Sequence, residues 1–317
     1  MFKHIILFLI SILVIACQQE KPDKVIQIAT LKGPSAMGMI KMIDSLNQCK
    51  DADIKITIYN EPIQVRKLML SKEATFAILP TTMGSILYNK EVSYQLAAIP
   101  VWGTLYLFGT DTTITQWSDL KGKRIYLMAK GMTPDVLFRH LLIQNGINPE
   151  QDVIIDYSFP THIDLANAVA AGQASLGVIS EPMVSMVVQK NKTVRSLLDL
   201  NYEWNKIHPD IPIAQTALLV KSGFAKENPE KIKGIMKACK VSSDWVNKNP
   251  EQAAQLIAKY KILPDSLTAL MSIPRSNIDF KEAKHIKNQI NSYLMIFYDL
   301  NADIIGGKIP DDNFYLK

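Results

Sequence analysis

Two short stretches with the same arrangement of a lysine, a glycine and a hydroxyl residue could carry the chemistry of this chain. They are KGPS at residues 32–35 and KGMT at residues 130–133. Each follows an apolar run typical of a strand and precedes a helical pattern, so each predicts the start of a helix. Free N–H groups and the helix dipole favour an anionic or strongly polar group at such a point. The chemistry indicated is ligand binding.

Recognisable catalytic chemistry is missing from the sequence. Its five histidines and three cysteines form no HExxH or CxxC motif, and the chain has no GxSxG motif and no P-loop. An enzyme would need a nucleophile with a base and an orienting group, or a set of metal ligands. We therefore expect no enzymatic activity, no catalytic residue, no cofactor and no metal.

The two stretches belong to an internal repeat with an offset of about 100 residues. In the first copy we predict strands at 54–59 and 75–79 and helices at 63–70 and 82–88. The second copy repeats them at 153–155, 162–171, 176–179 and 182–188. Strands that alternate with helices predict an α/β fold with parallel strands, and two copies predict two lobes. The matched residues are Ile63 with Ile163, Ala74 with Ala174, Met83 with Met183, Ser85 with Ser185, and Lys90 with Lys190.

The loops that leave these strands define the predicted site, because ligands of open α/β sheets bind outside the carboxyl ends of the strands. Ser35 and Thr133 are expected to cap their helices and to face each other across a cleft, and Pro134 suits a first helical turn. The predicted ligand-binding residues are Lys32, Gly33, Pro34, Ser35, Ala36, Met37, Pro80, Thr81, Thr82, Trp102, Gly103, Gly131, Met132, Thr133, Pro134, Thr161, His162, Ser180, Glu181, Pro182 and Thr216.

Several of these residues have a plain structural alternative. Lys32 and Lys130 could neutralise an anion or could be solvated, and His162 could bind an anion as a cation or complete the hydrogen bonds of its loop. Trp102 could stack on a planar ligand or pack at a hinge. Tyr106 could likewise stack on a planar ligand or pack at a hinge. Met37 and Met132, which the repeat matches, could form an apolar wall of the site or fill gaps in the packing.

Long apolar strands at 95–109 and 211–220 are expected to carry the chain between the lobes. Residues 224–317 have an almost wholly helical pattern, so we expect them to complete the first lobe. The predicted organisation is 25–110 and 213–317 for lobe 1, with the second part mainly helical, and 111–212 for lobe 2.

The N-terminus is typical of an exported protein. Lys3 precedes an apolar run at 5–15, which is too short for a membrane-spanning helix and suits a secretion signal. The run ends before Cys17 in a pattern that resembles a bacterial lipobox. We expect a signal peptide at 1–16, lipidation of Cys17, a tether at 17–24 and anchoring to the membrane through the lipid. Cys49 and Cys239 remain, either free or paired.

The bulk composition supports a folded binding protein. A chain of 317 residues with 48% hydrophobic residues can bury two cores. Its net charge of +5 is spread along the sequence, without the basic cluster that nucleic-acid binding needs. We expect a monomer that does not bind nucleic acid.

Five further motifs give a family resemblance. They are LKGPSAMGM from Leu31, AILPTTMGSILYNK from Ala77, DLKGKRIYLMAKGMTPD from Asp119, the SEP loop at 180–182 and GGKIPDDNFY from Gly306. Together they resemble the substrate-binding lipoproteins of ABC importers, in the group related to nitrate, sulfonate, taurine and thiamine-pyrimidine binding proteins. The SEP loop is usually PEP in such relatives.

The resemblance implies a periplasmic-binding-protein fold of the second type, whose two lobes close on a ligand. It also implies an ABC permease with its ATPase as partner, and a small organic anion or heteroaromatic as ligand. Two alternatives are a surface sensor or signalling module with the same fold, and an enzyme of the related menaquinone pathway. A neighbouring permease gene would favour transport, and a sensor gene would favour signalling.

Overall fold

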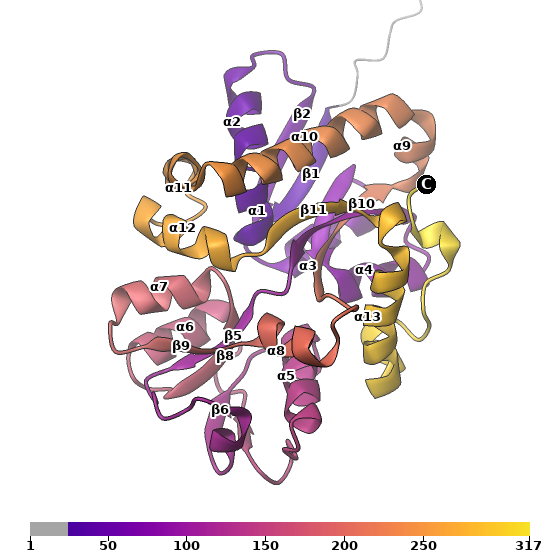
Figure 1. The fold of residues 1–317 in the computed structure, drawn as a ribbon. Helices are drawn as coiled ribbons and strands as arrows, with labels where there is room; N and C mark the ends of the chain where they lie inside the picture. Colours follow the sequence, from indigo (N-terminus) through magenta and orange to yellow (C-terminus); the bar gives the residue numbers. More distant parts are fainter. Residues whose placement is uncertain (1–24) are drawn as a thin grey trace, which may run out of the picture.

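The computed structural model describes residues 25–317, so the predictions on the signal peptide, on Cys17 and on the tether up to residue 24 lie outside the described residues. The described chain forms two lobes, each built around one sheet (Figure 1). The strand order is β11-β4-β10-β3-β1-β2 in lobe 1 and β7-β6-β8-β5-β9 in lobe 2. The expected two-lobed α/β architecture is confirmed.

Lobe 1 combines the beginning and the end of the described chain. Helices α1, α2 and α10 pack on one face of its sheet, and α3, α4 and α13 pack on the other. Its strands are β1 (Ile26–Leu31), β2 (Ile54–Tyr59), β3 (Phe76–Pro80), β4 (Tyr94–Trp102), β10 (Ala214–Lys221) and β11 (Ile278–Glu282). Its helices are α1 (Pro34–Gly38), α2 (Ile40–Gln48), α3 (Pro62–Leu70), α4 (Thr81–Asn89), α9 (Ser222–Glu227), α10 (Pro229–Lys248), α11 (Pro250–Lys259), α12 (Ser266–Ser272) and α13 (Lys287–Leu300).

Lobe 2 contains the middle of the chain, with α5 and α8 on one face of its sheet and α6 and α7 on the other. Its strands are β5 (Leu105–Gly109), β6 (Arg124–Tyr126), β7 (Ile154–Asp156), β8 (Leu176–Ser180) and β9 (Arg195–Asp199). Its helices are α5 (Thr133–Gln144), α6 (His162–Ala170), α7 (Met183–Lys190) and α8 (Leu200–Ile207). Short 3-10 helices in the two lobes are η1 (Trp117–Leu120), η2 (Ile273–Arg275), η3 (Ala283–His285), η4 (Ala302–Ile305) and η5 (Asp312–Phe314).

The internal repeat is visible in both hydrogen bonds and burial. The Ala74 N–H donates to the carbonyl of Leu68 at 3.2 Å, and the Ala174 N–H donates to Ala168 at the same distance. Both bonds close the turn between a helix and the next strand. The two copies therefore share a local fold as well as a sequence pattern. Matched pairs with the same exposure are Ile63 and Ile163, which are exposed, and Ser85 and Ser185, which are buried.

Two features of the fold differ from the sequence-based expectation. Leu105–Gly109 pairs with β8 and β9 of lobe 2, so the chain leaves lobe 1 at Gly103 and not after residue 110. The helical C-terminal segment also contains β11, which pairs antiparallel with β4. Ile278 and Phe280 of β11 are buried and alternate with polar residues. This alternation of apolar and polar residues is too short to distinguish a strand from a helical turn. Its partner strand, β4, lies far away in the sequence, so local patterns do not reveal the pairing.

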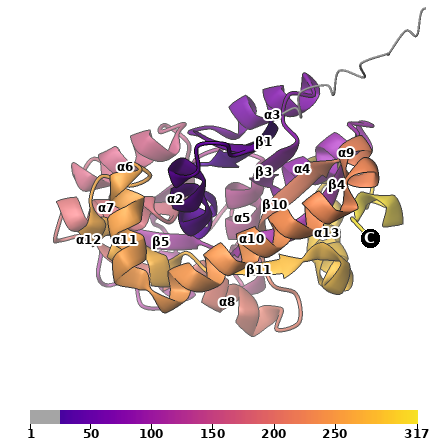
Figure 2. The ribbon, with the colours of Figure 1, turned by 90° about the horizontal axis from the view of Figure 1, so that it is seen from above.

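Helices of the C-terminal segment also reach lobe 2. Helix α12 packs on α7, and both views place the two helices side by side (Figures 1 and 2). On the opposite side of the lobe interface, the ring of Trp204 on α8 lies 6.2 Å from the ring of Tyr293 on α13. Both residues are fully buried, so Trp204 is part of the packing between the lobes.

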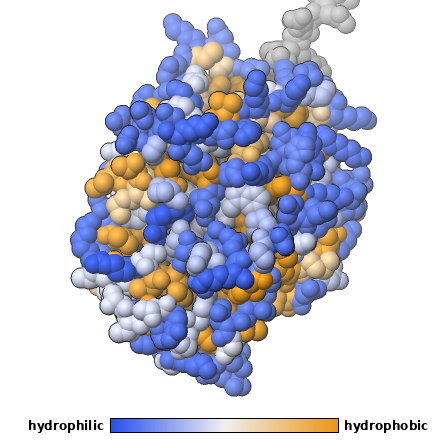
Figure 3. All heavy atoms as spheres, viewed as in Figure 1, coloured by the Kyte–Doolittle hydropathy of each residue, from blue (hydrophilic) through white to orange (hydrophobic). Residues whose placement is uncertain are grey.

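The face drawn in Figure 3 is mostly polar, and the two described cysteines are free. Polar residues cover most of the face in Figure 3, with hydrophobic residues in small groups between them. Cys49 is exposed and Cys239 is buried, and both are free, so the disulfide alternative does not apply. Within residues 25–317, no helix is both long and apolar enough to span a membrane.

A partly buried histidine pair should make the stability of the protein depend on pH. His140 on α5 and His208 after α8 lie 2.8 Å apart between their Nε2 atoms. Burial, with the charge of His208, lowers the pKa of His140 from 6.5 to about 4. The unfolded chain therefore takes up a proton at a higher pH than the folded protein does. The free energy of unfolding should fall by roughly 2 kcal/mol as the pH drops from about 6.5 to about 4.

Urea denaturation at several pH values measures this dependence. His140→Gln keeps a hydrogen-bonding group beside His208 but does not titrate, so its profile should be flatter than that of the parent protein. An unchanged slope in this variant would show that the pH dependence arises elsewhere.

Candidate functional site

The loops predicted to bind a ligand lie where the two lobes meet. Gly33 follows β1 in lobe 1, and a Cβ added to it would lie 3.2 Å from Cδ of Pro182 in lobe 2. The hydroxyl oxygens of Thr82 on α4 and Thr133 on α5 lie 2.8 Å apart and share a hydrogen bond. These contacts join loops that leave the strands of opposing sheets. The lobes are therefore closed on each other at these loops.

Two helix starts from different lobes meet at this place. Helix α4 begins at Thr81 and α5 begins at Thr133, and the bond between Thr82 and Thr133 joins their first turns. Each start contributes free N–H groups and a partial positive charge. The junction is suited to a negatively charged or strongly polar group.

The two predicted caps have other roles in the structure. Helix α1 has Gly33 at its N-cap and α5 has Met132, and neither helix has a side-chain cap. Ser35 instead shares a hydrogen bond with Thr216 on β10, with 3.3 Å between their oxygens. Thr133 has Thr82 as its partner, so neither residue caps its helix as expected, and each bonds a different hydroxyl residue. The hydrogen-bond partner of Ser35 or of Thr133 depends on where its helix begins across the sheet. The sequence does not specify this position.

Two buried hydroxyl groups of lobe 1 have no hydrogen-bond partner among the described residues. They belong to Thr30, at the end of β1, and to Thr81, at the start of α4. Both residues are at most 1% exposed. A buried unpaired hydroxyl costs on the order of 1–3 kcal/mol, so such groups are usually paired with a ligand or a water. Thr30 was missed from sequence, although its place at the carboxyl end of a strand could have indicated it.

His162 stands at the first position of α6, which Thr161 caps by accepting a hydrogen bond from the N–H of Asp164 at 3.1 Å. Burial lowers the pKa of His162 and favours its neutral form. This direction disfavours the cationic form, so anion binding by His162 as a cation stays a prediction. A neutral imidazole can still donate one hydrogen bond and accept one.

Glu181 joins the lobes and is not free for a ligand. Its carboxylate, which has no exposed surface, forms an ion pair with Arg275 of η2 at 2.5 Å. It also accepts hydrogen bonds from the Ser185 hydroxyl at 3.1 Å and from the Ser272 hydroxyl at 3.3 Å. Since Ser272 and Arg275 belong to the C-terminal segment that packs on lobe 1, Glu181 ties the two lobes together.

Arg275 has further partners in lobe 2 and was missed from sequence. Its guanidinium lies 4.2 Å from the ring centroid of Tyr106 and donates to the Ser196 hydroxyl at 3.0 Å. The Tyr106 hydroxyl donates to the carbonyl of Arg275 at 3.1 Å, so Tyr106 packs between the lobes. One sequence signal for Arg275 was Glu181, an acidic residue in a loop expected to be buried. A buried carboxylate needs a positively charged partner nearby.

The remaining charged and apolar candidates differ in their exposure. Lys32 and Lys130 are exposed, and Lys130 lies 5.5 Å from the ring of Tyr157. Met37 is fully buried in the core between the lobe 1 sheet and α2, whereas Met132 is 41% exposed. The two methionines therefore do not form a common apolar wall, because their neighbours in the two lobes differ.

Trp102 and Gly103 lie at the first crossover between the lobes. The Trp102 indole N–H donates to the carbonyl of Asp279 on β11 at 2.7 Å, which fixes the ring toward the β11 edge of the sheet. A Cβ added to Gly103 would lie 2.3 Å from the side-chain oxygen of Asn201, so α8 approaches the chain closely at this crossover. Trp102 and Gly103 are thus hinge residues.

The other candidates lie at the predicted strand ends and helix starts. Ala36 and Pro182 are buried, Pro34, Pro80, Pro134 and Ser180 are half-buried, and Gly131 is exposed.

Two α/β lobes joined by two crossovers, with helix starts of both lobes meeting between them, define the periplasmic-binding-protein fold of the second type. The family model described as NMT1/THI5 like matches residues 49–253. The chain belongs to this family, and the expected resemblance is confirmed.

Individual relatives agree on the fold. The crystal structure of an ABC transporter protein from Parabacteroides distasonis is 24% identical, with a TM-score of 0.80 over 93% of this chain and 99% of that chain. The periplasmic aliphatic sulphonate binding protein SsuA from Escherichia coli is 17% identical, with a TM-score of 0.73 over 93% and 92% of the two chains. The nitrate/nitrite binding protein NrtA of Nostoc sp. is 25% identical over 194 residues, which are 61% of this chain and 42% of that protein. The match thus spans less than half of the length of that relative.

Proposed function

We propose that this protein is an extracytoplasmic solute-binding protein of an ABC importer, which holds a small organic anion or heteroaromatic between its lobes. The observation that carries the proposal is the junction of two helix starts at Thr82 and Thr133, together with the unpaired hydroxyl of Thr81 at the start of α4. The names of the relatives support it, since they include binding proteins for sulphonates and for nitrate or nitrite. A permease with its ATPase would receive the ligand.

The chemistry around the junction favours an anion whose oxygens accept hydrogen bonds. Lys32 and Lys130 are exposed, and Arg275 is paired with Glu181. Helix N–H groups and threonine hydroxyls, in place of a cationic side chain, would bind the charged group of the ligand. A sulfonate of the taurine type meets this description. A heteroaromatic has less support, because Trp102 lies toward the β11 edge and Met37 in the core.

A thermal-shift screen tests the proposal. Taurine, an alkanesulfonate, nitrate, an aminopyrimidine and a flavin would each be added to the protein without its signal sequence. A ligand that binds only the folded state at 100 times its Kd adds about 2.7 kcal/mol of stability, so the melting temperature should rise by several degrees. A sulfonate is expected to give the largest shift. The absence of a shift with all five compounds would contradict the proposed ligand class.

Thr81→Val is expected to weaken binding of the best sulfonate by about tenfold, because one good hydrogen bond to a charged group contributes about 1.5–3 kcal/mol. Valine has nearly the shape of threonine but no hydroxyl. Isothermal titration calorimetry measures the change. The matched control is Thr57→Val on β2, which has the same chemistry outside the lobe junction. Equal affinities in the two variants would exclude the Thr81 hydroxyl from the site.

Membrane attachment through a lipid on Cys17 is part of the proposal. Replacement of Cys17 by serine removes the only thiol that the lipobox-like pattern places at the cleavage point. The full-length variant should move from the membrane fraction to the soluble fraction when expressed in a bacterium with a lipoprotein pathway. Continued membrane association of the serine variant would rule out this anchor.

A further inference from the structure

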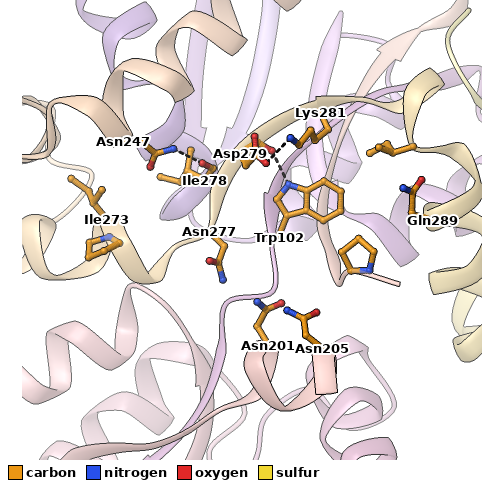
Figure 4. A pocket seen from close by; sticks show the side chains of 13 residues that line it. Trp102, Asn201, Asn205, Asn247, Ile273, Asn277, Ile278, Asp279, Lys281 and Gln289 are labelled. Atoms are coloured by element: carbon orange, nitrogen blue, oxygen red, sulfur yellow. Dashed lines mark hydrogen bonds and ion pairs between the residues drawn. The ribbon is translucent and has the colours of Figure 1, made fainter. Parts of the chain in front are cut away.

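A second pocket lies behind the hinge, at the β11 edge of the lobe 1 sheet. It has a volume of about 530 Å³ and is lined by residues of both lobes (Figure 4). Trp102 and Asn277 line it from lobe 1, Asn201 and Asn205 of α8 line it from lobe 2, and Pro212 lines it from the second crossover. Of the residues predicted for the cleft, it shares only Trp102. The volume suits a small organic molecule.

Carboxamides dominate the polar lining of this hinge pocket. They are contributed by Asn201, Asn205, Asn247, Asn277 and Gln289. The two charged residues in the lining, Asp279 and Lys281, form an ion pair with each other at 3.0 Å. The pocket therefore offers many donors and acceptors without a net charge, which favours a neutral ligand over an ion.

Much of this hydrogen-bonding capacity is unused. The side-chain amides of Asn201, Asn205 and Gln289 make no hydrogen bond with any of the described residues, 25–317. Asn247 donates from Nδ2 to the carbonyl of Ile278 at 2.6 Å, and Asn277 donates to the carbonyl of Gly103. Both of these keep their side-chain oxygen as an acceptor, so each of the five carboxamides has at least one group left for a ligand.

The pocket also has an apolar part that is fixed in place. The ring of Trp102 is held by the bond from its N–H to Asp279, and it lies in the middle of the pocket (Figure 4). Ile273 and Ile286 add aliphatic surface on the lobe 1 side. A fixed indole among carboxamides combines an apolar surface for C–H groups with partners for hydroxyl groups.

We propose that the hinge pocket is a second binding site, which takes a neutral, hydroxyl-rich small molecule such as a mono- or disaccharide or a polyol. Carboxamides bind hydroxyl groups as both donors and acceptors, and the Trp102 ring packs against the C–H face of the molecule. Because Asn201 and Asn205 belong to lobe 2 and Trp102 to lobe 1, an occupant contacts both lobes in their closed arrangement. The lining of this pocket supports the site whichever ligand the cleft takes.

Fluorine NMR of protein labelled with 5-fluorotryptophan tests the proposal. The chain has four tryptophans, and Trp102→Phe assigns the signal of Trp102 by its loss. Glucose, sucrose and myo-inositol would be titrated separately into the protein without added cleft ligand. At least one of them should shift the Trp102 signal saturably and leave the other three signals in place. Failure of all three to give a saturable shift overturns the proposal, as does a linear shift of all four signals, which would report a bulk solvent effect.

A matched pair of variants shows where the molecule binds. Asn205→Leu removes one carboxamide from the wall of the hinge pocket, and Asn167→Leu makes the same change on α6, outside the pocket; both asparagines are exposed on lobe 2 helices. Asn205→Leu should weaken binding at least tenfold, and Asn167→Leu should leave it unchanged. An equal affinity in both variants would place the binding elsewhere and overturn the proposal.

Discussion

Replacement of Arg275 by alanine is expected to lower the free energy of unfolding by about 3 kcal/mol, because it leaves the fully buried carboxylate of Glu181 without its cation. Two hydroxyl donors, from Ser185 and Ser272, remain beside that carboxylate and cannot replace a charge. The variant also loses the contacts of the guanidinium with Tyr106 and Ser196. Urea denaturation measures the change.

The matched control is Arg124→Ala. Arg124 forms an ion pair with Asp156 at 2.6 Å on the surface of lobe 2, where 49% of its side chain is exposed. Exposed pairs of this kind contribute about 0–1 kcal/mol, so the control should lose little stability. If Arg275→Ala were no more destabilising than Arg124→Ala, the pair between Glu181 and Arg275 would not be an important tie.

The same substitution should change the arrangement of the lobes. Arg275 belongs to the segment that packs on lobe 1, and its charged partner and ring partner belong to lobe 2. Without it, the unliganded protein should be more open, and small-angle X-ray scattering should give a larger radius of gyration than for Arg124→Ala. A ligand that binds both lobes should reverse the increase.

Gly33→Val is expected to weaken ligand binding in the cleft by about a hundredfold, corresponding to about 2.7 kcal/mol. The first reason is steric, because an added Cβ would lie 3.2 Å from the Pro182 ring and the valine methyl groups would extend further. The second is the backbone, since Gly33 has φ 111° and ψ −147°, a region that is essentially restricted to glycine. Both effects oppose the closed arrangement. Calorimetry with the best ligand of the screen measures the affinity.

Gly172→Val separates the steric effect from backbone strain. Gly172 also has a positive φ, of 72°, but nothing lies within 4 Å of an added Cβ. This control should lose stability by about 1–3 kcal/mol from strain and keep its affinity. If both valine variants bound the ligand as tightly as the parent protein, the contact between Gly33 and Pro182 would not belong to the ligand-bound state.

Local patterns were sufficient for most of the elements. The offset of 100 residues aligned two strand-and-helix units, and the structure shows the same hydrogen bonds at Ala74 and Ala174. Proline in the first turn marks the start of α10 and α11, whereas α12 begins at Ser266 with Asp265 as its cap. These features depend on residues within a few positions of each other, which is why sequence determines them.

Local sequence patterns did not predict which distant segments contact each other. Ser35 and Thr133 were expected to face each other across a cleft; in the structure Ser35 shares a hydrogen bond with Thr216, and Thr133 shares one with Thr82. All four residues were predicted for the site, but neither of these two contacts was predicted. The sequence pattern of a helix start is the same wherever the helix lies across the sheet. It therefore does not predict which residue of another segment will be its hydrogen-bond partner.

By itself, the sequence determined the two-lobed α/β class, the loops at the strand ends and the family resemblance, because periodicity, caps and repeats are local properties of the chain. The tertiary structure alone decided that β11 completes the lobe 1 sheet, that Arg275 neutralises Glu181 across the lobes, and that a pocket of carboxamides lies behind the hinge. Each of these brings together segments that are distant in the sequence, and their contacts depend on how the lobes pack.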